Sequence, residues 1–301
     1  MGDIVLTTPV IRCLKKQLNA EVHLLTQKRF FCLLENNPHL HHLHAIEEGL
    51  DNLKTEGFDL LIDLHHNLRS ATVKKALGVP SKSYHKLNFQ KWLLTTFKIN
   101  RLPKQHIVDR YLETVSHLGV KNDCAGLDFF ISPSLQLPAN FILPKKYVAL
   151  VIGGQHATKL LPLHKLQEVC QRITDPIVLV GGPEDEPKGA VIAKTHSHVL
   201  NSCGVLTIQQ SAYVLQHSER VITHDTGMMH IAAALQKRIV SIWGNTVPEF
   251  GMYPYVANDQ YQILEVKNLS CRPCSKIGHK KCPKGHFKCM NEIDLSLLSS
   301  K

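Results

Sequence analysis

The residues best suited to chemistry form the polar turn His224-Asp225-Thr226-Gly227, which ends a short apolar run and opens an Ala-rich helical pattern. The first N–H groups of a helix have no partner within it, and the helix dipole adds partial positive charge there. A strand, a tight turn and a helix in this order therefore predict an anion site, for which phosphate is a common ligand. The turn alone is equally consistent with Asp225 and Thr226 simply capping the helix.

Two further loops follow predicted strands and carry polar side chains. The loop 153–159 combines two glycines with Thr158 and Lys159. The glycines would let the backbone approach a ligand, and the lysine offers a positive charge to a diphosphate, unless it is only a solvated surface residue. An acidic side chain after the next strand can accept hydrogen bonds from ribose hydroxyls, with Glu184 as first choice and Asp185 as second. In a parallel sheet these loops meet at the carboxyl edge, where ligands bind.

The sequence resembles the glycosyltransferase family of lipopolysaccharide heptosyltransferases. That family carries Asp-Thr-Gly-x-x-His before an Ala-rich helix and Gly-x-Thr-x-Pro after the next strand. Here the motifs are Asp225-Thr226-Gly227-Met228-Met229-His230 and Gly244-Asn245-Thr246-Val247-Pro248, and further matches recur in order along nearly all of the chain. The resemblance implies that the Thr226 and Gly227 amides and Lys159 hold the donor diphosphate, with His230 also on the donor side.

The same resemblance implies an activity. This activity is the inverting transfer of a heptose from ADP-heptose to the lipopolysaccharide inner core. The acceptor is anionic and carries Kdo or heptose on lipid A. The reaction requires no cofactor. Two alternatives stay open. One is a degenerate, non-catalytic protein that binds a nucleotide sugar, and the other is a GT-B transferase with a different sugar donor.

Transfer of this kind needs a base that takes the proton of the acceptor hydroxyl. In the family it is the Asp of a Gly-Asp pair that opens the first helix, which corresponds to Gly2-Asp3 here, with Thr7-Thr8-Pro9 following as in the family. The alternative is that Asp3 is only a helix cap. Family members carry a first strand and an Arg-x-Ser turn ahead of this pair. We therefore expect the N-terminal domain to lack its first strand, and to be less stable and less active than a chain extended upstream.

Acceptor contacts are expected from the first half of the chain. Arg69 follows the strand expected over residues 60–64 and could pair with a sugar carboxylate. Lys86 belongs to a basic stretch, residues 82–92, of the kind that faces an anionic glycolipid. For His106 and Arg110, on the helix expected over residues 107–118, a structural role is at least as good an interpretation.

The whole chain has an α/β pattern, in which short β runs alternate with helical ones. Strands are expected over residues 21–25, 60–64, near 83, 147–152, 177–180 and 238–243, and helices over 107–118, 162–173, 190–194 and 211–217. A Pro-rich segment over 132–144 lacks periodicity and suggests a linker. These features predict two Rossmann-like domains, an acceptor-binding domain over 1–140 and a donor-binding domain over 141–301. With the resemblance, they imply the GT-B architecture, in which substrates meet between the domains.

Composition limits the class of protein. The chain has 301 residues, 44% hydrophobic and 20% charged, which is typical of a folded enzyme and excludes disorder. No apolar run approaches the roughly 18 residues of a membrane span, and no signal peptide is recognisable, so we expect a cytoplasmic protein. The net charge of +10 suits a polyanionic partner and a peripheral position at the inner membrane. We expect no nucleic acid, because no zinc-finger, RRM or helix-turn-helix pattern is present.

Nine cysteines in a cytoplasmic chain do not suggest a disulfide framework. Five are scattered singly, whereas Cys271, Cys274, Cys282 and Cys289 lie in one Cys-rich segment, residues 271–289. Four thiols at this spacing fit a structural zinc ion, and free or paired thiols are the alternative.

Overall fold

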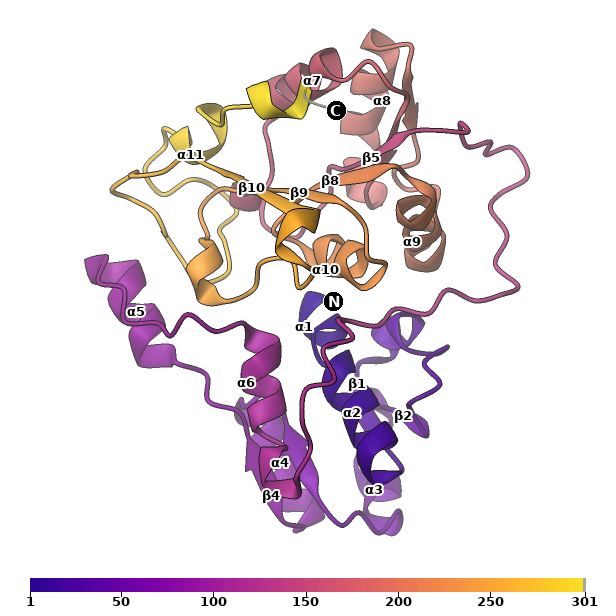
Figure 1. Ribbon diagram of the computed structural model, residues 1–301, viewed down its shortest axis with the longest axis vertical. Helices are drawn as coiled ribbons and strands as arrows, with labels where there is room; N and C mark the ends of the chain where they lie inside the picture. Colours follow the sequence, from indigo (N-terminus) through magenta and orange to yellow (C-terminus); the bar gives the residue numbers. More distant parts are fainter. Residues whose placement is uncertain (300–301) are drawn as a thin grey trace.

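The computed structural model describes residues 1–299 and shows two α/β units, one above the other in Figure 1. The C-terminal unit contains a six-stranded parallel sheet in the order β10-β9-β8-β5-β6-β7. Its strands are β5 (Val148–Val151), β6 (Ile177–Val180), β7 (Val199–Asn201), β8 (Arg220–His224), β9 (Ile239–Trp243) and β10 (Tyr261–Glu265). The runs that form β5, β6 and β9 are buried throughout, as expected for parallel strands covered on both faces.

Helices follow most of these strands, and the chain order of the strands creates a switch point. The helices are α7 (Leu163–Arg172), α8 (Glu186–Thr195), α9 (Ile208–His217), α10 (Gly227–Ala234) and α11 (Lys288–Asn291). After β5, the chain adds β6 and β7 on one side, then returns to place β8 on the other side of β5. The loops after β5 and β8 therefore lie next to each other where the strand order reverses, which is the usual ligand position in open α/β sheets.

The N-terminal unit has smaller sheets. Among the described residues it pairs β1 (His23–Thr26) with β2 (His42–Ala45) and β3 (Leu61–Asp63) with β4 (Ser81–Ser83), both parallel. Its helices are α1 (Gly2–Val5), α2 (Thr8–Leu18), α3 (Asp51–Thr55), α4 (Leu68–Leu77), α5 (Asn88–Phe97) and α6 (Ile107–Glu113). The helix expected over 107–118 is thus shorter and is followed by a separate 3-10 turn. The expectation of a missing first strand stays a prediction.

Short 3-10 helices connect many of these elements. They are η1 (Lys28–Leu33), η2 (Ile46–Glu48), η3 (Ser116–Leu118), η4 (Ala157–Lys159), η5 (Pro183–Asp185), η6 (Pro248–Phe250), η7 (Asn258–Gln260) and η8 (Ser296–Ser299). Sequence analysis missed the strands β2, β7 and β10. β7 and β10 end the sheet, are partly exposed and lack a continuous buried run, so their pattern is weak.

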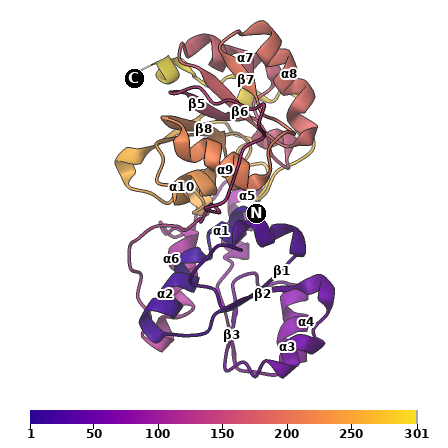
Figure 2. The ribbon, with the colours of Figure 1, turned by 90° about the vertical axis from the view of Figure 1, so that its right-hand side faces the viewer.

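The two units meet at α1 and α10, which lie side by side in Figures 1 and 2. Residues 119–147, which include the predicted linker, contain no helix or strand and connect the units. A second contact forms at the start of α6, where His106 Nδ1 accepts a bond from Val108 N at 3.2 Å and Nε2 donates to Tyr253 O at 2.9 Å. His106 is therefore a helix cap that also ties the units together, which supports its structural interpretation. The domain boundary near residue 140 stays a prediction.

Candidate active site

Three loops of the large sheet converge on one carboxylate. Asp225 Oδ2 accepts hydrogen bonds from Lys159 Nζ at 2.6 Å and from Thr246 Oγ1 at 2.7 Å. Lys159 lies in the loop after β5 and Thr246 in the loop after β9, so Asp225, directly after β8, joins its neighbours on both sides. The Lys159 and Asp225 side chains are only 17% and 9% exposed, so water screens their charges little. A cation is thus held in place at the switch point of the sheet.

The turn between β8 and α10 packs against the N-terminal residue, since a Cβ atom on Gly227 would lie 2.8 Å from Met1 Sδ. Thr226 is the N-cap of α10, but no side chain makes a capping bond to this helix. The Thr226 hydroxyl oxygen is itself buried, and it has no hydrogen-bond partner within residues 1–299. A buried polar atom without a partner costs free energy, and an anion here would accept bonds from both the hydroxyl and the first helix amides. Thr226 therefore holds the N-cap position without a capping bond from its side chain, and the anion-binding role of the turn stays a prediction.

The glycines of the loop after β5 have a different role from the one expected. A Cβ atom on Gly154 would lie 2.8 Å from Thr226 Cγ2 and 2.9 Å from Leu160 Cδ2. Protein atoms occupy the space that a ligand was expected to use. Gly154 therefore allows two loops of the protein to approach each other, and the side chain of Lys159 and the turn at Thr226 remain the candidate ligand-binding groups.

Two other predicted donor contacts are already engaged by the protein. The Thr158 hydroxyl donates to His279 O at 3.1 Å and accepts from His279 N at 2.8 Å, so it holds the Cys-rich segment against the donor loop. Asp185 is buried and accepts from Gly182 N at 3.0 Å, and burial raises the pKa of this carboxyl. Glu184 is exposed beside it, which leaves its carboxylate free for a ligand.

His230 packs α1 against α10. It is 2% exposed, and burial lowers its pKa to about 3, so the ring is neutral. A Cβ atom on Gly2 would lie 2.7 Å from His230 Cδ2, which shows how closely the two helices approach. His230 thus packs the two helices together, and its buried Nδ1 atom has no partner among the described residues, so the donor contact that the resemblance implied stays a prediction. Its packing places Asp3, the next residue of α1, beside the turn.

Asp3 is exposed and faces a cluster of tyrosines and cations. Burial raises the pKa of Tyr84 to about 12, and the negative charge of Asp3 is the second cause of this shift. The Tyr84 and Tyr111 rings lie 4.9 Å apart. Burial lowers the pKa of Lys91 to about 8, and the positive charge of Arg110 is the second cause of this shift. The negative charge of Asp3 acts in the opposite direction. A carboxylate and two cationic side chains therefore lie together next to the anion site.

Arg110, for which a structural role was expected to be at least as good an interpretation, has contacts that make it a candidate for ligand binding. It is 5% exposed and donates through Nη2 to Phe250 O at 3.2 Å, yet its Nε and Nη1 atoms have no partner among the described residues. A buried guanidinium with unpaired donors is suited to a carboxylate or phosphate. The sequence feature that could have indicated its burial is its position three residues after Ile107, which places it on the buried face of α6.

The predicted acceptor residues lie in two places. Lys86 is half-buried and close enough to Lys91 to lower its pKa. Arg69 is exposed and instead lines a shallow hollow with Gln27, Ile46 and Glu47. The structure therefore joins Lys86, but not Arg69, to the cluster around Asp3.

The four cysteines of the Cys-rich segment lie near one another but more loosely than the tightest groups of metal-ligating side chains among the described residues. All nine cysteines are free, and Cys271 Sγ lies 3.8 Å from His286 Nε2. Within the described chain, the groups of three metal-ligating side chains whose donor atoms approach within 4.8 Å lie elsewhere. Burial and, after it, the neighbouring thiols Cys271 and Cys282 raise the pKa of Cys274 to about 11, so the four cysteines lie near one another and the structural zinc site stays a prediction. The segment also supports the donor loops, since Cys274 N donates to Asn245 O at 3.0 Å.

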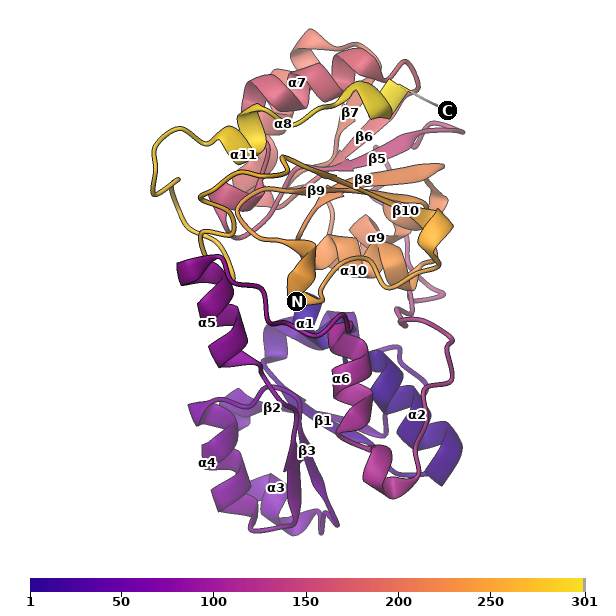
Figure 3. The same cartoon turned by 60° about the vertical axis from the view of Figure 1, so that its left-hand side comes forward.

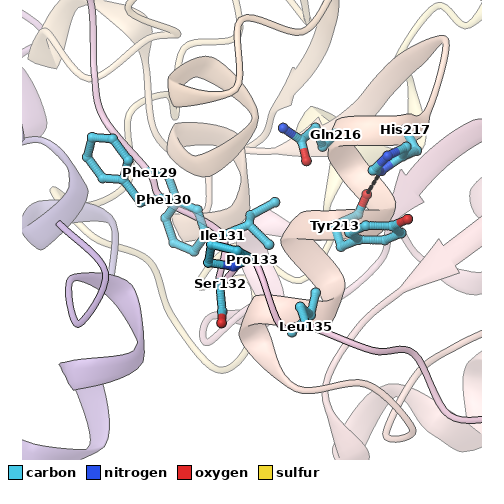
Figure 4. A pocket seen from close by; sticks show the side chains of 9 residues that line it. All are labelled: Phe129, Phe130, Ile131, Ser132, Pro133, Leu135, Tyr213, Gln216 and His217. Carbon is cyan, nitrogen blue, oxygen red and sulfur yellow. Dashed lines mark hydrogen bonds between the residues drawn. The ribbon is translucent and has the colours of Figure 1, made fainter. Parts of the chain in front are cut away.

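A further hollow lies between the linker and α9 (Figure 4). Its lining exposes more polar than apolar surface, and its titratable side chains are Tyr213 and His217, whose Nδ1 lies 2.9 Å from Tyr213 O. It contains none of the predicted site residues and no Lys or Arg. Because a diphosphate needs cations, the junction of the two units is the better candidate site.

The two α/β units meet at a helix N-terminus that has no side-chain capping bond, and a lysine and a carboxylate lie at the switch point of the sheet. This arrangement defines an enzyme of the nucleotide-binding α/β class. The family model of glycosyltransferase family 9 (heptosyltransferase) matches residues 50–284, and the chain belongs to this family. It is therefore a glycosyltransferase, and its parallel α/β units are those of the GT-B fold.

Particular relatives are distant in sequence but similar in fold. Lipooligosaccharide heptosyltransferase 2 of Campylobacter jejuni is 24% identical over 77% of this chain and 71% of its own length. A family 9 glycosyltransferase from Veillonella parvula superposes with a TM-score of 0.74 at 20% identity, covering 99% of this chain and 92% of the other. Escherichia coli heptosyltransferase WaaC with ADP gives a TM-score of 0.64 at 18% identity, covering 87% and 90%.

Proposed function

We propose that this protein transfers a heptose from ADP-heptose to the inner core of lipopolysaccharide, with inversion at the anomeric carbon. The observation that carries the proposal is the junction of Lys159, Asp225 and Thr246 beside an uncapped helix and the α1 carboxylate. The relatives support the choice of substrates, since they are named heptosyltransferases and one is described with ADP. A degenerate binding protein is less favoured because the catalytic candidate Asp3 is exposed beside the anion site.

The residues divide the reaction between them. The acceptor hydroxyl oxygen attacks the anomeric carbon, and the bond from that carbon to the diphosphate oxygen breaks in the same displacement. Asp3 takes the hydroxyl proton. Lys159 and the Thr226 and Gly227 amides stabilise the charge that develops on departing ADP, and Glu184 binds the ribose. Arg110, Lys91 and Lys86 hold an anionic group of the acceptor.

The donor part is tested by thermal shift with ADP, UDP, GDP and CMP. We expect ADP to raise the Tm of the wild type most, and to raise that of Lys159→Ala much less. Lys194→Ala, an exposed lysine on α8, is the control and should match the wild type. Loss of Lys159 leaves Asp225 without its cation, so the variant can have a lower Tm even without ADP. The quantity to compare between the proteins is therefore the increase in Tm that ADP causes. No shift in folded wild type would refute the donor site. A larger shift with UDP, GDP or CMP would indicate a different sugar donor.

We also propose that α5 attaches the protein to an anionic membrane surface. Phe89, Trp92 and Phe97 are 64%, 45% and 56% exposed and contact one another, with ring centroids 5.9 and 5.2 Å apart. Lysines on and near α5 add positive charge beside this apolar patch, and α5 projects from the molecule in Figure 3. Aromatic side chains with flanking lysines are typical of interfacial helices. No helix among the described residues is long and apolar enough to span a membrane.

Vesicle co-sedimentation tests this attachment. Wild type should bind vesicles that contain phosphatidylglycerol more strongly than phosphatidylcholine vesicles, and Phe89→Ser/Trp92→Ser should lose most of this binding. Ile142→Ser is the matched control, because Ile142 is 82% exposed in the linker. Equal binding by the α5 variant and the wild type would exclude α5 as the attachment site.

We propose that transfer requires no cofactor and that the Cys-rich segment acts as a reduced support for the donor loops. Activity should survive dialysis against a chelator in the presence of a thiol-free reductant. Loss of turnover on chelation, restored by zinc, would contradict this.

A further inference from the structure

A histidine cluster lies in the N-terminal unit, outside the proposed active site. Side chains of successive strand residues point to opposite faces. In β1 and β2 this places Leu24 and Leu43 against the core and leaves His23, His42 and His44 on the other face, with His23 and His42 opposite each other in register. The proposed transfer reaction uses none of these imidazoles.

Two of these rings are in direct contact. His23 Nδ1 lies 2.8 Å from His44 Nε2, and the ring planes are within 15° of each other. The pair is shielded from water, since His44 is 9% exposed and Phe58 packs edge-on against His23. Glu56, at the end of α3, completes a group of three whose donor atoms all lie within 4.8 Å of one another.

We propose that His23, His44 and Glu56 bind a divalent first-row transition metal ion, with zinc as the natural probe. Two imidazole nitrogens and one carboxylate oxygen form a ligand set that suits Zn²⁺, Co²⁺ or Ni²⁺, with the fourth position open to water. In the metal-free protein one ring donates its N–H to the nitrogen of the other, and on metal binding this proton moves to the other nitrogen of the same ring. Burial lowers the pKa of both histidines, which favours the neutral form that binds metals.

A second group shares one ligand with the first. Glu21 and His41 approach His23 within the same limit, but both are exposed. The more buried group with the direct nitrogen contact is the better site, because fewer waters compete there. His23 belongs to both groups, so its removal eliminates either arrangement.

The position of the ligands indicates what the ion would do. His23 and His44 come from the β1–β2 sheet, whereas Glu56 precedes β3 of the second small sheet. A bound ion would thus join two sheets that are not hydrogen-bonded to each other. We expect it to raise the Tm of the protein without a change in turnover.

The test uses full-length, chelator-treated and reduced protein titrated with Zn²⁺ and Co²⁺. The wild type should bind one equivalent that raises its Tm, and its cobalt spectrum should be that of a nitrogen–oxygen site without thiolate ligands. His23→Gln should lose this equivalent and the Tm increase, and Glu56→Gln should bind at least tenfold more weakly. The ADP-induced shift of each variant reports that it is folded.

His196→Gln is the matched control. His196 and His198 form another histidine pair, with ring centroids 6.0 Å apart, in the C-terminal unit. This variant should bind zinc like the wild type. Unchanged stoichiometry and affinity in His23→Gln, or a cobalt spectrum of thiolate ligands only, would refute the proposal.

Discussion

Arg110 and Lys91 carry positive charge into a part of the junction that water reaches poorly. Burial lowers the pKa of both side chains, because a desolvated cation loses hydration energy. The Nε and Nη1 atoms of Arg110 have no partner within the described chain. An anionic acceptor group would pair with this guanidinium and offset its desolvation cost. The proposed acceptor site would therefore depend on residues whose charge is unfavourable until substrate binds.

The proposed base, Asp3, can be tested directly by substitution. Asp3→Asn removes the carboxylate that takes the proton but keeps the size of the side chain. We expect kcat to fall about 10²- to 10⁴-fold, with the ADP-induced Tm shift unchanged. Initial rates with ADP-heptose measure this. Asp51→Asn, another acid in the first turn of a helix, is the control and should keep full activity. Full turnover by Asp3→Asn would show that another group is the base.

The pKa of Lys91, lowered to about 8 by burial, predicts a pH dependence. The side chain is cationic below this value and neutral above it, so its attraction to an acceptor anion decreases as the pH rises through 8. We expect the KM for acceptor to rise about tenfold between pH 7 and 9. Lys91→Arg should flatten the profile, because arginine stays charged. Identical profiles for the two proteins would exclude this role.

At the scale of elements, the contact of α1 with α10 positions the chemistry. Both helices are short, and the contact between Gly2 and His230 determines how closely they approach. His106 makes a comparable junction by capping α6 and bonding to Tyr253 in the other unit. The proposed base and the proposed donor turn thus lie on separate elements, and Gly2, His230, Met1 and Gly227 all contribute to the contact between them.

Gly2→Ala tests this arrangement. The new Cβ would lie 2.7 Å from His230 Cδ2, and the buried ring has little room to move, so α1 and Asp3 must shift. We expect activity to fall about 100-fold, because catalytic groups tolerate little displacement. Steady-state kinetics of the double variant Gly2→Ala/His230→Ala should show partial recovery relative to Gly2→Ala. Wild-type activity in Gly2→Ala would mean that this packing does not control the base.

For the whole molecule, three buried histidines link stability to pH. Burial lowers the pKa of His106 to about 4 and those of His224 and His230 to about 3. In the unfolded chain these groups have a pKa near 6.5. Below that value the unfolded state binds about three more protons than the folded state, so the free energy of unfolding decreases as the pH falls from 6.5 towards 4.

The expected slope is about 4 kcal/mol per pH unit over the steepest range. Urea unfolding at pH 8, 7, 6 and 5 measures it, and the slope from these groups falls to nearly zero by about pH 8. His106→Asn can still cap α6 but does not titrate here, so it should reduce the slope by about one third. A free energy of unfolding that stays constant from pH 7 to 5 would contradict this interpretation.

The sequence by itself indicated the α/β pattern and the central strands β5, β6, β8 and β9 with the turn after β8, because those signals are local. A buried β run followed by Asp225-Thr226-Gly227 and an Ala-rich helix specifies strand, turn and helix within a few residues of each other. Lys159 was identified in the same way, from a loop between a strand and a helix.

The tertiary structure alone decided which polar groups already have partners. Thr158 is satisfied by His279, 121 residues later, and Arg110 is left with unpaired donors because Phe250 meets only part of its guanidinium. The His23–His44 contact likewise depends on strand register. Hydrogen-bond partners and burial arise from contacts between distant segments, and local sequence patterns do not specify them.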